Sequence, residues 1–146
     1  MRILLFCLII IGMLSFTEQW GTQLDEAKAK ARKENKSILL IFTGSDWDKK
    51  SEKFKTDILS SSDFKTYTSK SLELVVVDFP RLNKNKLSQD QVSHNNIVLE
   101  KYNSTRKIPY LLLLDETGKI IDVLDINFTT NVFVNQIKQR IDQAKQ

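Results

Sequence analysis

Cysteine is almost absent from this sequence, since Cys7 is the only one among 146 residues. One cysteine cannot form an internal disulfide, so a disulfide-stapled scaffold is excluded. Histidine is equally scarce, and His94 alone cannot build a usual zinc site without further cysteines. The carboxylates do not follow the spacing of a calcium loop. We therefore expect neither a metal ion nor a cofactor.

Glycine and proline are also rare, with four and two residues, which leaves little room for linkers or disorder. A chain of this length favours one domain. The formal net charge is +4, but both signs are interspersed along the sequence. The best basic cluster, residues 81–86, has the composition of a polar loop and not of a basic binding face. We therefore expect no nucleic-acid partner.

The N-terminus has a different character. Arg2 is followed by an uncharged apolar run, Ile3 to Phe16, which also contains Cys7. A basic start and an apolar stretch of this length are typical of a secretory signal. The run is short for a membrane span, which needs about 20 residues. We predict a signal peptide over residues 1–17, an uncleaved anchor being the alternative, and one folded domain over residues 18–146. The protein is then exported, periplasmic or secreted, and touches a membrane only if the signal stays attached.

Hydrophobic periodicity predicts alternating elements in the folded part. Thr22 is the expected cap of the first helix, and Thr130 that of the last. Helical patterns cover residues 24–34, 47–58, 64–67, 92–102 and 130–141, and strand patterns cover residues 38–42, 72–77, 110–114 and 119–124. Alternation followed by a hairpin at residues 115–118 implies an α/β domain with a mixed central sheet and helices on both faces. We expect its buried layer to include Phe42, Val76, Leu112 and Leu113.

Four segments carry a resemblance to a known family. They are the run from Lys36 to Trp47 ending in Phe-Thr-Gly-Ser-Asp-Trp, the Val-Asp-Phe-Pro of residues 77–80, Ile108-Pro109, and the hairpin of residues 114–119. In this order they resemble exported thioredoxin-like proteins of the disulfide-reductase type. The resemblance covers nearly everything after the signal and implies a thioredoxin-like fold.

The sequence differs from the family at the residues that carry out the family's redox chemistry. In such proteins a Cys-x-x-Cys pair follows the tryptophan, whereas here Asp48-Lys49-Lys50-Ser51 follows Trp47. Asp48 takes the place of the nucleophilic cysteine and Ser51 that of the resolving one. A carboxylate at a helix start favours the helix by about 0.3–1 kcal/mol but cannot attack a disulfide. A serine hydroxyl needs a general base, and nothing in the sequence places His94, expected at the surface, beside Ser51. We expect no catalytic residue.

The resemblance also implies a cis peptide bond at Ile108-Pro109, opposite the start of the Asp48 helix. The backbone before that proline is available to hold an extended segment, much like an added strand. The expected partner-binding residues are Trp47, Asp48, Ile108 and Pro109. Core packing and partner contact stay open for Trp47, whereas Tyr110 is expected to pack against the core.

Two functions follow from these expectations. The first is a redox-inactive binding module that holds peptides or partner proteins in this groove. The alternative is an accessory partner of a thiol–disulfide oxidoreductase or isomerase system in the same compartment. Full thiol–disulfide activity is what the family suggests, and the missing cysteines argue against it. Asn-x-Ser/Thr triplets at Asn35, Asn103 and Asn127 matter only if the export route includes glycosylation.

Overall fold

The computed structural model describes residues 20–146, so the predicted signal peptide and Cys7 lie outside the described residues. The elements follow in the order α1 (Leu24–Glu34), β1 (Ser37–Thr43), α2 (Lys49–Phe54), a π-helical segment (Lys55–Leu59), α3 (Ser62–Ser71), β2 (Leu72–Asp78), a 3-10 turn (Asn83–Asn85), α4 (Gln89–Tyr102), β3 (Tyr110–Leu114), β4 (Ile120–Leu124) and α5 (Thr130–Ala144). Within residues 20–146, no helix has the length and apolar character needed to cross a membrane.

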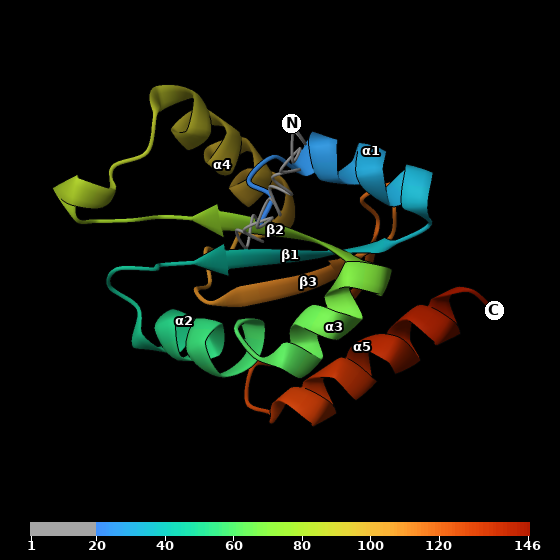
Figure 1. The fold of residues 1–146 in the computed structure, drawn as a ribbon. Coiled ribbons are helices and arrows are strands. Elements are labelled where there is room, and N and C mark those ends of the chain that lie inside the picture. Colours follow the sequence, from blue (N-terminus) through green and yellow to red (C-terminus); the bar gives the residue numbers. More distant parts are fainter. Residues whose placement is uncertain (1–19) are drawn as a thin grey trace, which may run out of the picture.

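The strands form one mixed sheet in the order β2-β1-β3-β4. β1 and β2 run parallel, whereas β3 is antiparallel to both β1 and β4. Helices α1 and α4 cover one face of the sheet, and α2, α3 and α5 cover the other (Figure 1). The predicted α/β architecture, a mixed sheet with helices on both faces, is confirmed.

β1 is buried on both faces, which explains its unbroken apolar run. Successive side chains of a strand point to opposite faces, so Leu39 and Ile41 pack with α2, α3 and α5, whereas Ile38 and Phe42 pack with α1 and α4. β3 divides its leucines in the same way, with Leu113 on the first face and Leu112 on the second. Phe42, Leu112 and Leu113 are all completely buried, as predicted.

Val76 is only partly buried, so the prediction that it belongs to the buried layer is wrong. It lies on β2, one of the two outer strands of the sheet, on the face of that strand where cover is incomplete. Its side chain lines an open hollow of about 620 Å³ beside α2. The edge of β2 is met instead by the backbone of Gly21, which donates to Leu74 O at 2.9 Å and accepts from Val76 N at 2.9 Å.

The structure corrects both predicted helix caps. α1 begins after Gln23 and not after Thr22, and the backbone N–H of Leu24 donates to Nε2 of His94 at 3.2 Å. A histidine from α4 therefore satisfies one of the free N–H groups at the start of α1. α5 begins after Thr129, and the hydroxyl of Thr130 donates to Asp57 O at 3.1 Å.

The segment from residue 47 to residue 71 also differs from its prediction. Trp47 precedes α2, which begins at Lys49, so Trp47 does not share a helical face with Phe54. The predicted break near residue 60 is present at the end of the π-helical segment. The short helical turn expected around residues 64–67 is the longer helix α3, capped by the hydroxyl of Ser61, which accepts from Phe64 N at 3.3 Å.

Candidate functional site

Asp48 and Ser51, which the resemblance assigns to the Cys-x-x-Cys positions, bind each other. Oδ2 of Asp48 accepts the backbone N–H of Ser51 at 2.7 Å and its hydroxyl at 2.7 Å. The hydroxyl oxygen in turn accepts the backbone N–H of Gly44 at 3.2 Å. Asp48 is thus the side-chain cap of α2, and Ser51 is buried with its hydroxyl donating once and accepting once.

No histidine lies among the hydrogen-bond partners of Ser51, whose hydroxyl contacts the Asp48 carboxylate and the Gly44 N–H. His94 is on α4, where its Nε2 accepts from Leu24 N and its Nδ1 lies 3.1 Å from Oδ1 of Asn95. His94 is half-buried, which corrects the expectation of a surface residue: it joins α4 to α1. The Ser51 hydroxyl is buried and held by the Asp48 carboxylate that also caps α2, an arrangement that fits a structural role.

The loop before α2 is tied to the end of β2 by Asp78. Its Oδ1 accepts the Thr43 hydroxyl at 2.7 Å and the Ser45 backbone N–H at 2.9 Å. Its Oδ2 accepts the Ser45 hydroxyl at 2.5 Å. Because Thr43 and Asp78 are register partners at the ends of β1 and β2, one carboxylate fixes the path of the chain as it leaves the sheet.

A second carboxylate on this loop, Asp46, holds the segment that follows β2. It accepts the backbone N–H groups of Arg81 and Leu82, each at 2.9 Å, and the side-chain amide of Asn85 at 3.0 Å. These bonds, that from Arg81 foremost, hold the pKa of the Asp46 carboxyl below its ordinary value. The loops after β1 and β2 therefore form one hydrogen-bonded unit.

Trp47 sits on this unit at the protein surface. Its indole Nε1–H donates to Phe79 O at 2.7 Å, and the guanidinium of Arg81 lies 3.7 Å from the ring centre. The side chain is 36% exposed, so core packing does not describe it. Gly44 makes room for it, since a Cβ there would lie 2.4 Å from the Trp47 ring. The ring is thereby presented to solvent in a fixed orientation.

Ile108 and Pro109 reach the same end of the sheet from β3. The peptide bond between them is cis, and both residues are half-buried. β3 pairs Tyr110 with Phe42, so the residue before Tyr110 comes alongside the end of β1. Tyr110 is partly buried, with its ring centre 6.3 Å from that of Phe42, as expected for core packing. The exact placement of Pro109 opposite Asp48 stays a prediction.

The turn before Ile108 depends on Asn103, one of the three glycosylation triplets. Its amide nitrogen donates to Lys107 O at 2.8 Å, and its oxygen accepts Lys107 N at 3.0 Å. The residue is 2% exposed. The side-chain nitrogen that a glycan would modify is thus buried and hydrogen-bonded. Asn103 therefore has a structural role in this turn and is not available as a glycosylation site in the folded protein. Asn35 and Asn127 are exposed.

The sequence analysis did not single out Asn95, a buried residue of α4 that binds the end of β2 next to the site. Its amide donates to Asp78 O at 2.9 Å, and its oxygen accepts Nε2 of Gln91 at 2.8 Å. A signal was present, since Asn95 lies three residues before Val98 and seven before Tyr102, on the buried face of the helix. Across residues 20–146, no cluster of three histidine, cysteine or acidic side chains has an arrangement that could hold a metal ion.

Comparison with known sequences identifies the class of protein. Residues 19–116 match the thioredoxin-like family, and the chain belongs to that family. Its sequence contains no Cys-x-x-Cys pair, because Cys7 is its only cysteine.

The chain is similar in both sequence and structure to proteins named DsbH. The disulfide bond reductase DsbH of Chlamydia pneumoniae is 37% identical over 101 residues, which are 69% of this chain and 58% of that protein. The chain thus spans little more than half the length of this curated relative. A solved DsbH oxidoreductase is 30% identical, with a TM-score of 0.76 over 85% of this chain and 84% of its own.

A more distant structure shares the fold alone. The disulphide isomerase of Xylella fastidiosa is 14% identical and has a TM-score of 0.58 over 80% of this chain and 86% of its own.

Proposed function

We propose that this chain is an exported, redox-inactive thioredoxin-like protein that binds peptides or partner proteins around Trp47, Asp48, Ile108 and Pro109. The observation that carries the proposal is the hydrogen-bonded pair of Asp48 and Ser51. A carboxylate and a hydroxyl close the first turn of α2 at 2.7 Å, where a redox relative needs a thiolate and a second thiol. Neither group can accept or release the electrons of disulfide exchange.

Binding is supported by what surrounds this pair. Trp47 is held at the surface by Phe79 O and by Arg81, which stacks on the ring, so the exposed part of the ring is presented without further ordering cost. Ile108 and Pro109 come directly before β3, beside the end of β1. An extended segment can be held at such a place through its backbone, with side chains contacting the tryptophan.

A second candidate role is that of an accessory partner in a thiol–disulfide system. The likeness to proteins named disulfide bond reductase and oxidoreductase favours it. In that role the chain binds substrates of a Cys-x-x-Cys enzyme without exchanging disulfides. Copurification with such an enzyme distinguishes this role from that of a free-standing binder.

The test is crosslinking in cells from a photoreactive residue at position 49. Lys49 is exposed and adjoins Asp48, so its replacement leaves the cap of α2 in place. A matched control carries the same residue at position 119, an exposed lysine in the turn between β3 and β4 at the other end of the sheet. We expect discrete protein adducts from position 49 and none from position 119. Identical adducts from both positions contradict a partner site at Asp48.

Redox inactivity is tested separately by insulin reduction in the presence of dithiothreitol. The unmodified protein should show only the background rate, because Ser51 and Asp48 supply no thiol. Activity above background makes this part of the proposal wrong, whatever the crosslinking result.

A further inference from the structure

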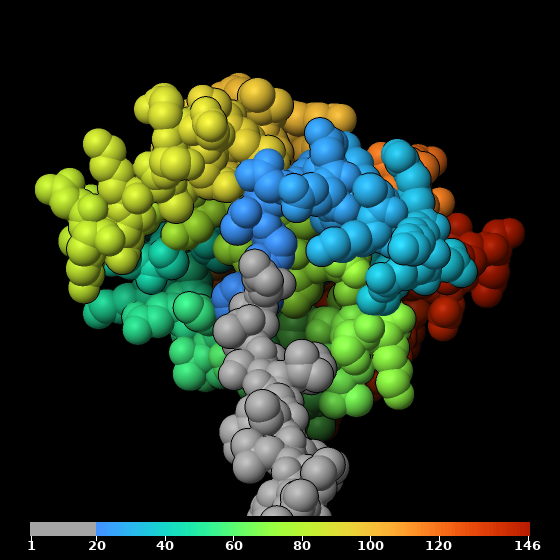
Figure 2. All heavy atoms as spheres, turned by 45° about the horizontal axis from the view of Figure 1, so that its top comes forward, coloured from blue at the N-terminus to red at the C-terminus, as the bar shows by residue number. Residues whose placement is uncertain are grey.

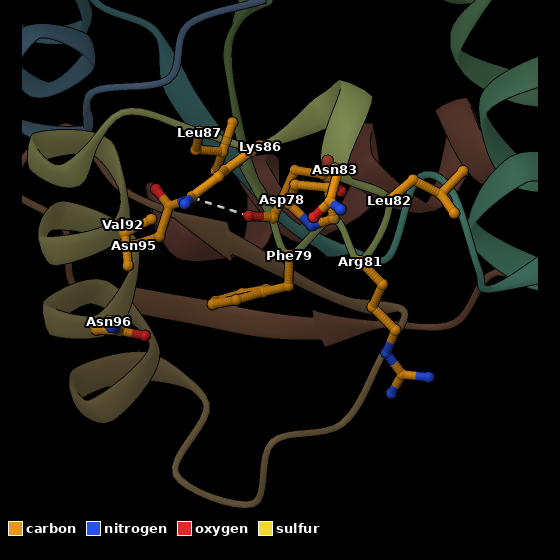
Figure 3. Close-up of a pocket in the computed structure, with 11 residues that line it drawn as sticks. Asp78, Phe79, Arg81, Leu82, Asn83, Lys86, Leu87, Val92, Asn95 and Asn96 are labelled. Atoms are coloured by element: carbon orange, nitrogen blue, oxygen red, sulfur yellow. Dashed lines mark hydrogen bonds between the residues drawn. The ribbon is translucent and has the colours of Figure 1, made fainter.

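The two outer strands of the sheet differ in what lies along their edges. Gly21 binds the edge of β2 at Leu74 O and Val76 N. The amide of Asn95 on α4 then holds the last residue of β2, donating to Asp78 O at 2.9 Å, the dashed line in Figure 3. β4 pairs with β3 on one side, and no other strand within residues 20–146 pairs with it. The outer side of β4 is therefore the open edge of the described sheet.

β4 also carries exposed apolar side chains. Val123 pairs with Leu112, and Ile120 pairs with Leu114. Both leucines pack on the face of the sheet that α1 and α4 cover. These two helices, blue to cyan and yellow in Figure 2, lie side by side, but they leave Ile120 46% and Val123 50% exposed. An open edge with exposed apolar side chains is a template for pairing with another chain.

A single charge interrupts the sequence of this strand. β4 reads Ile-Ile-Asp-Val-Leu, so Asp122 is its one charged residue. Short segments of high strand propensity and low charge are those that pair with copies of themselves. A charged residue within such a segment opposes that pairing.

The Asp122 carboxylate covers the backbone of β4 at this point. Its Oδ1 accepts the Val123 backbone N–H at 2.8 Å, and its Oδ2 accepts Nε–H of Arg140 on α5 at 2.7 Å. An N–H that pairs with β3 is already occupied, so an N–H that binds a side chain instead belongs to the open side of the strand. Arg140 fixes the carboxylate in this position. Both side chains are partly exposed, so the ion pair itself contributes little stability.

The backbone of β4 is irregular at the same place. Leu113 pairs with Asp122 and Leu114 with Ile120, which leaves Ile121 as an extra residue in β4. Such a bulge twists the strand and interrupts the regular row of backbone groups that a further strand would need. The bulge and the covered N–H therefore act in the same direction.

We propose that the Asp122–Arg140 pair is an edge guard that keeps β4 from pairing with β4 of a second copy of this chain. In an antiparallel pair centred on Asp122, the two Asp122 carboxylates lie directly opposite each other, and like charges in that position are destabilising. The Val123 N–H, which such a pair would use, is held by the same carboxylate. The inference is independent of the proposed function, because it uses none of the residues placed around Asp48.

The test is the self-association of purified variants, measured by sedimentation velocity over a range of protein concentrations. Asp122→Val removes the carboxylate and leaves an uninterrupted apolar strand. Asp142→Val is the matched control, because it makes the same change of charge at an exposed position of α5. Arg140→Gln keeps the carboxylate but releases it from α5.

We expect Asp122→Val to associate about tenfold more tightly than the parent, or more, because a repelled and covered edge becomes an apolar, accessible one. Arg140→Gln should give a smaller increase, and Asp142→Val should behave like the parent. Equal association of the parent and Asp122→Val overturns the inference. An equal increase in Asp142→Val overturns it too, since the effect is then one of net charge.

A second change separates edge pairing from association through unfolded chains. Proline lacks an N–H and is tolerated in an edge strand where that group faces outward. Adding Val123→Pro to Asp122→Val should therefore restore the parent's behaviour. Hydrogen exchange gives an independent readout, since the Val123 amide of Asp122→Val should become more protected as its concentration rises. Association without that protection, or association of the parent that Val123→Pro abolishes, contradicts a guarded edge at β4.

Discussion

The side chains of Asp48 and Ser51 meet at 2.7 Å across the first turn of α2, and the same Asp48 oxygen also accepts the Ser51 backbone N–H at 2.7 Å. The spacing that brings two cysteines together in a redox relative here brings together an acceptor and a donor. The pair satisfies groups that are otherwise left free at a helix start. The scaffold of the site is therefore stabilised by the residues that replace its chemistry.

Replacing the cap should destabilise the fold measurably. We expect Asp48→Ala to lower the free energy of unfolding by about 0.5–2 kcal/mol, because α2 loses its side-chain cap. The buried hydroxyl of Ser51 also loses its acceptor. Urea denaturation provides the measurement. Asp48→Asn is the control, since it keeps an oxygen that can accept both bonds. An equal loss in Asp48→Asn shows that the charge, and not the acceptor, is what stabilises the turn.

Asp46 should make stability depend on pH in the acid range. The hydrogen bond from the Arg81 backbone lowers the pKa of its carboxyl in the folded state, so the unfolded chain binds the proton more readily. The contribution is complete above the unfolded pKa, about 4, and is lost as the pH falls through the folded value. Between pH 6 and pH 2.5 the parent should lose more stability than Asp46→Asn. Parallel pH profiles for the two proteins contradict this assignment.

Leu112 tests the buried layer of the sheet. It is completely buried on the face covered by α1 and α4, so Leu112→Ala should cost about 2–5 kcal/mol of unfolding free energy. Val123→Ala is the control, because Val123 pairs with Leu112 on β4 yet is 50% exposed. The control should change stability by less than about 0.5 kcal/mol. Similar losses in the two variants mean that the sheet face is less tightly packed than described.

Sequence patterns predicted best the strands that are covered on both faces, because their burial appears in the sequence as an unbroken apolar run. β1 and β3 are continuous apolar runs because both of their faces are covered, and a run such as Ile38–Phe42 carries that information itself. β2 has a similar run, but as one of the two outer strands it leaves Val76 partly exposed. A strand's place in the sheet depends on the whole topology, which a single run does not encode.

The polar contacts behind the site were beyond sequence reasoning for the same reason. His94 accepts from Leu24 across 70 positions of sequence, and Asn95 reaches Asp78 across 17. Histidine and asparagine are also common on solvent-exposed helix faces, so neither residue type indicates a buried partner by itself. Only the packing of α4 against α1 and β2 selects the buried partner. The motif around Trp47 could be recognised from the sequence because its residues are consecutive.

Restoring the cysteines asks whether the scaffold still supports redox chemistry. In the parent, the backbone N–H of residue 51 donates to Asp48. In the double variant Asp48→Cys, Ser51→Cys, the same N–H can donate to a thiolate at position 48. Free N–H groups and the neighbouring Lys49 and Lys50 lower a thiol pKa. We expect this double variant to form a disulfide and to reduce insulin with dithiothreitol above the parent's background rate. Asp48→Cys alone is the control, because without a resolving thiol it stalls as a mixed disulfide. A folded but inert double variant means that the surrounding surface has diverged together with the cysteines.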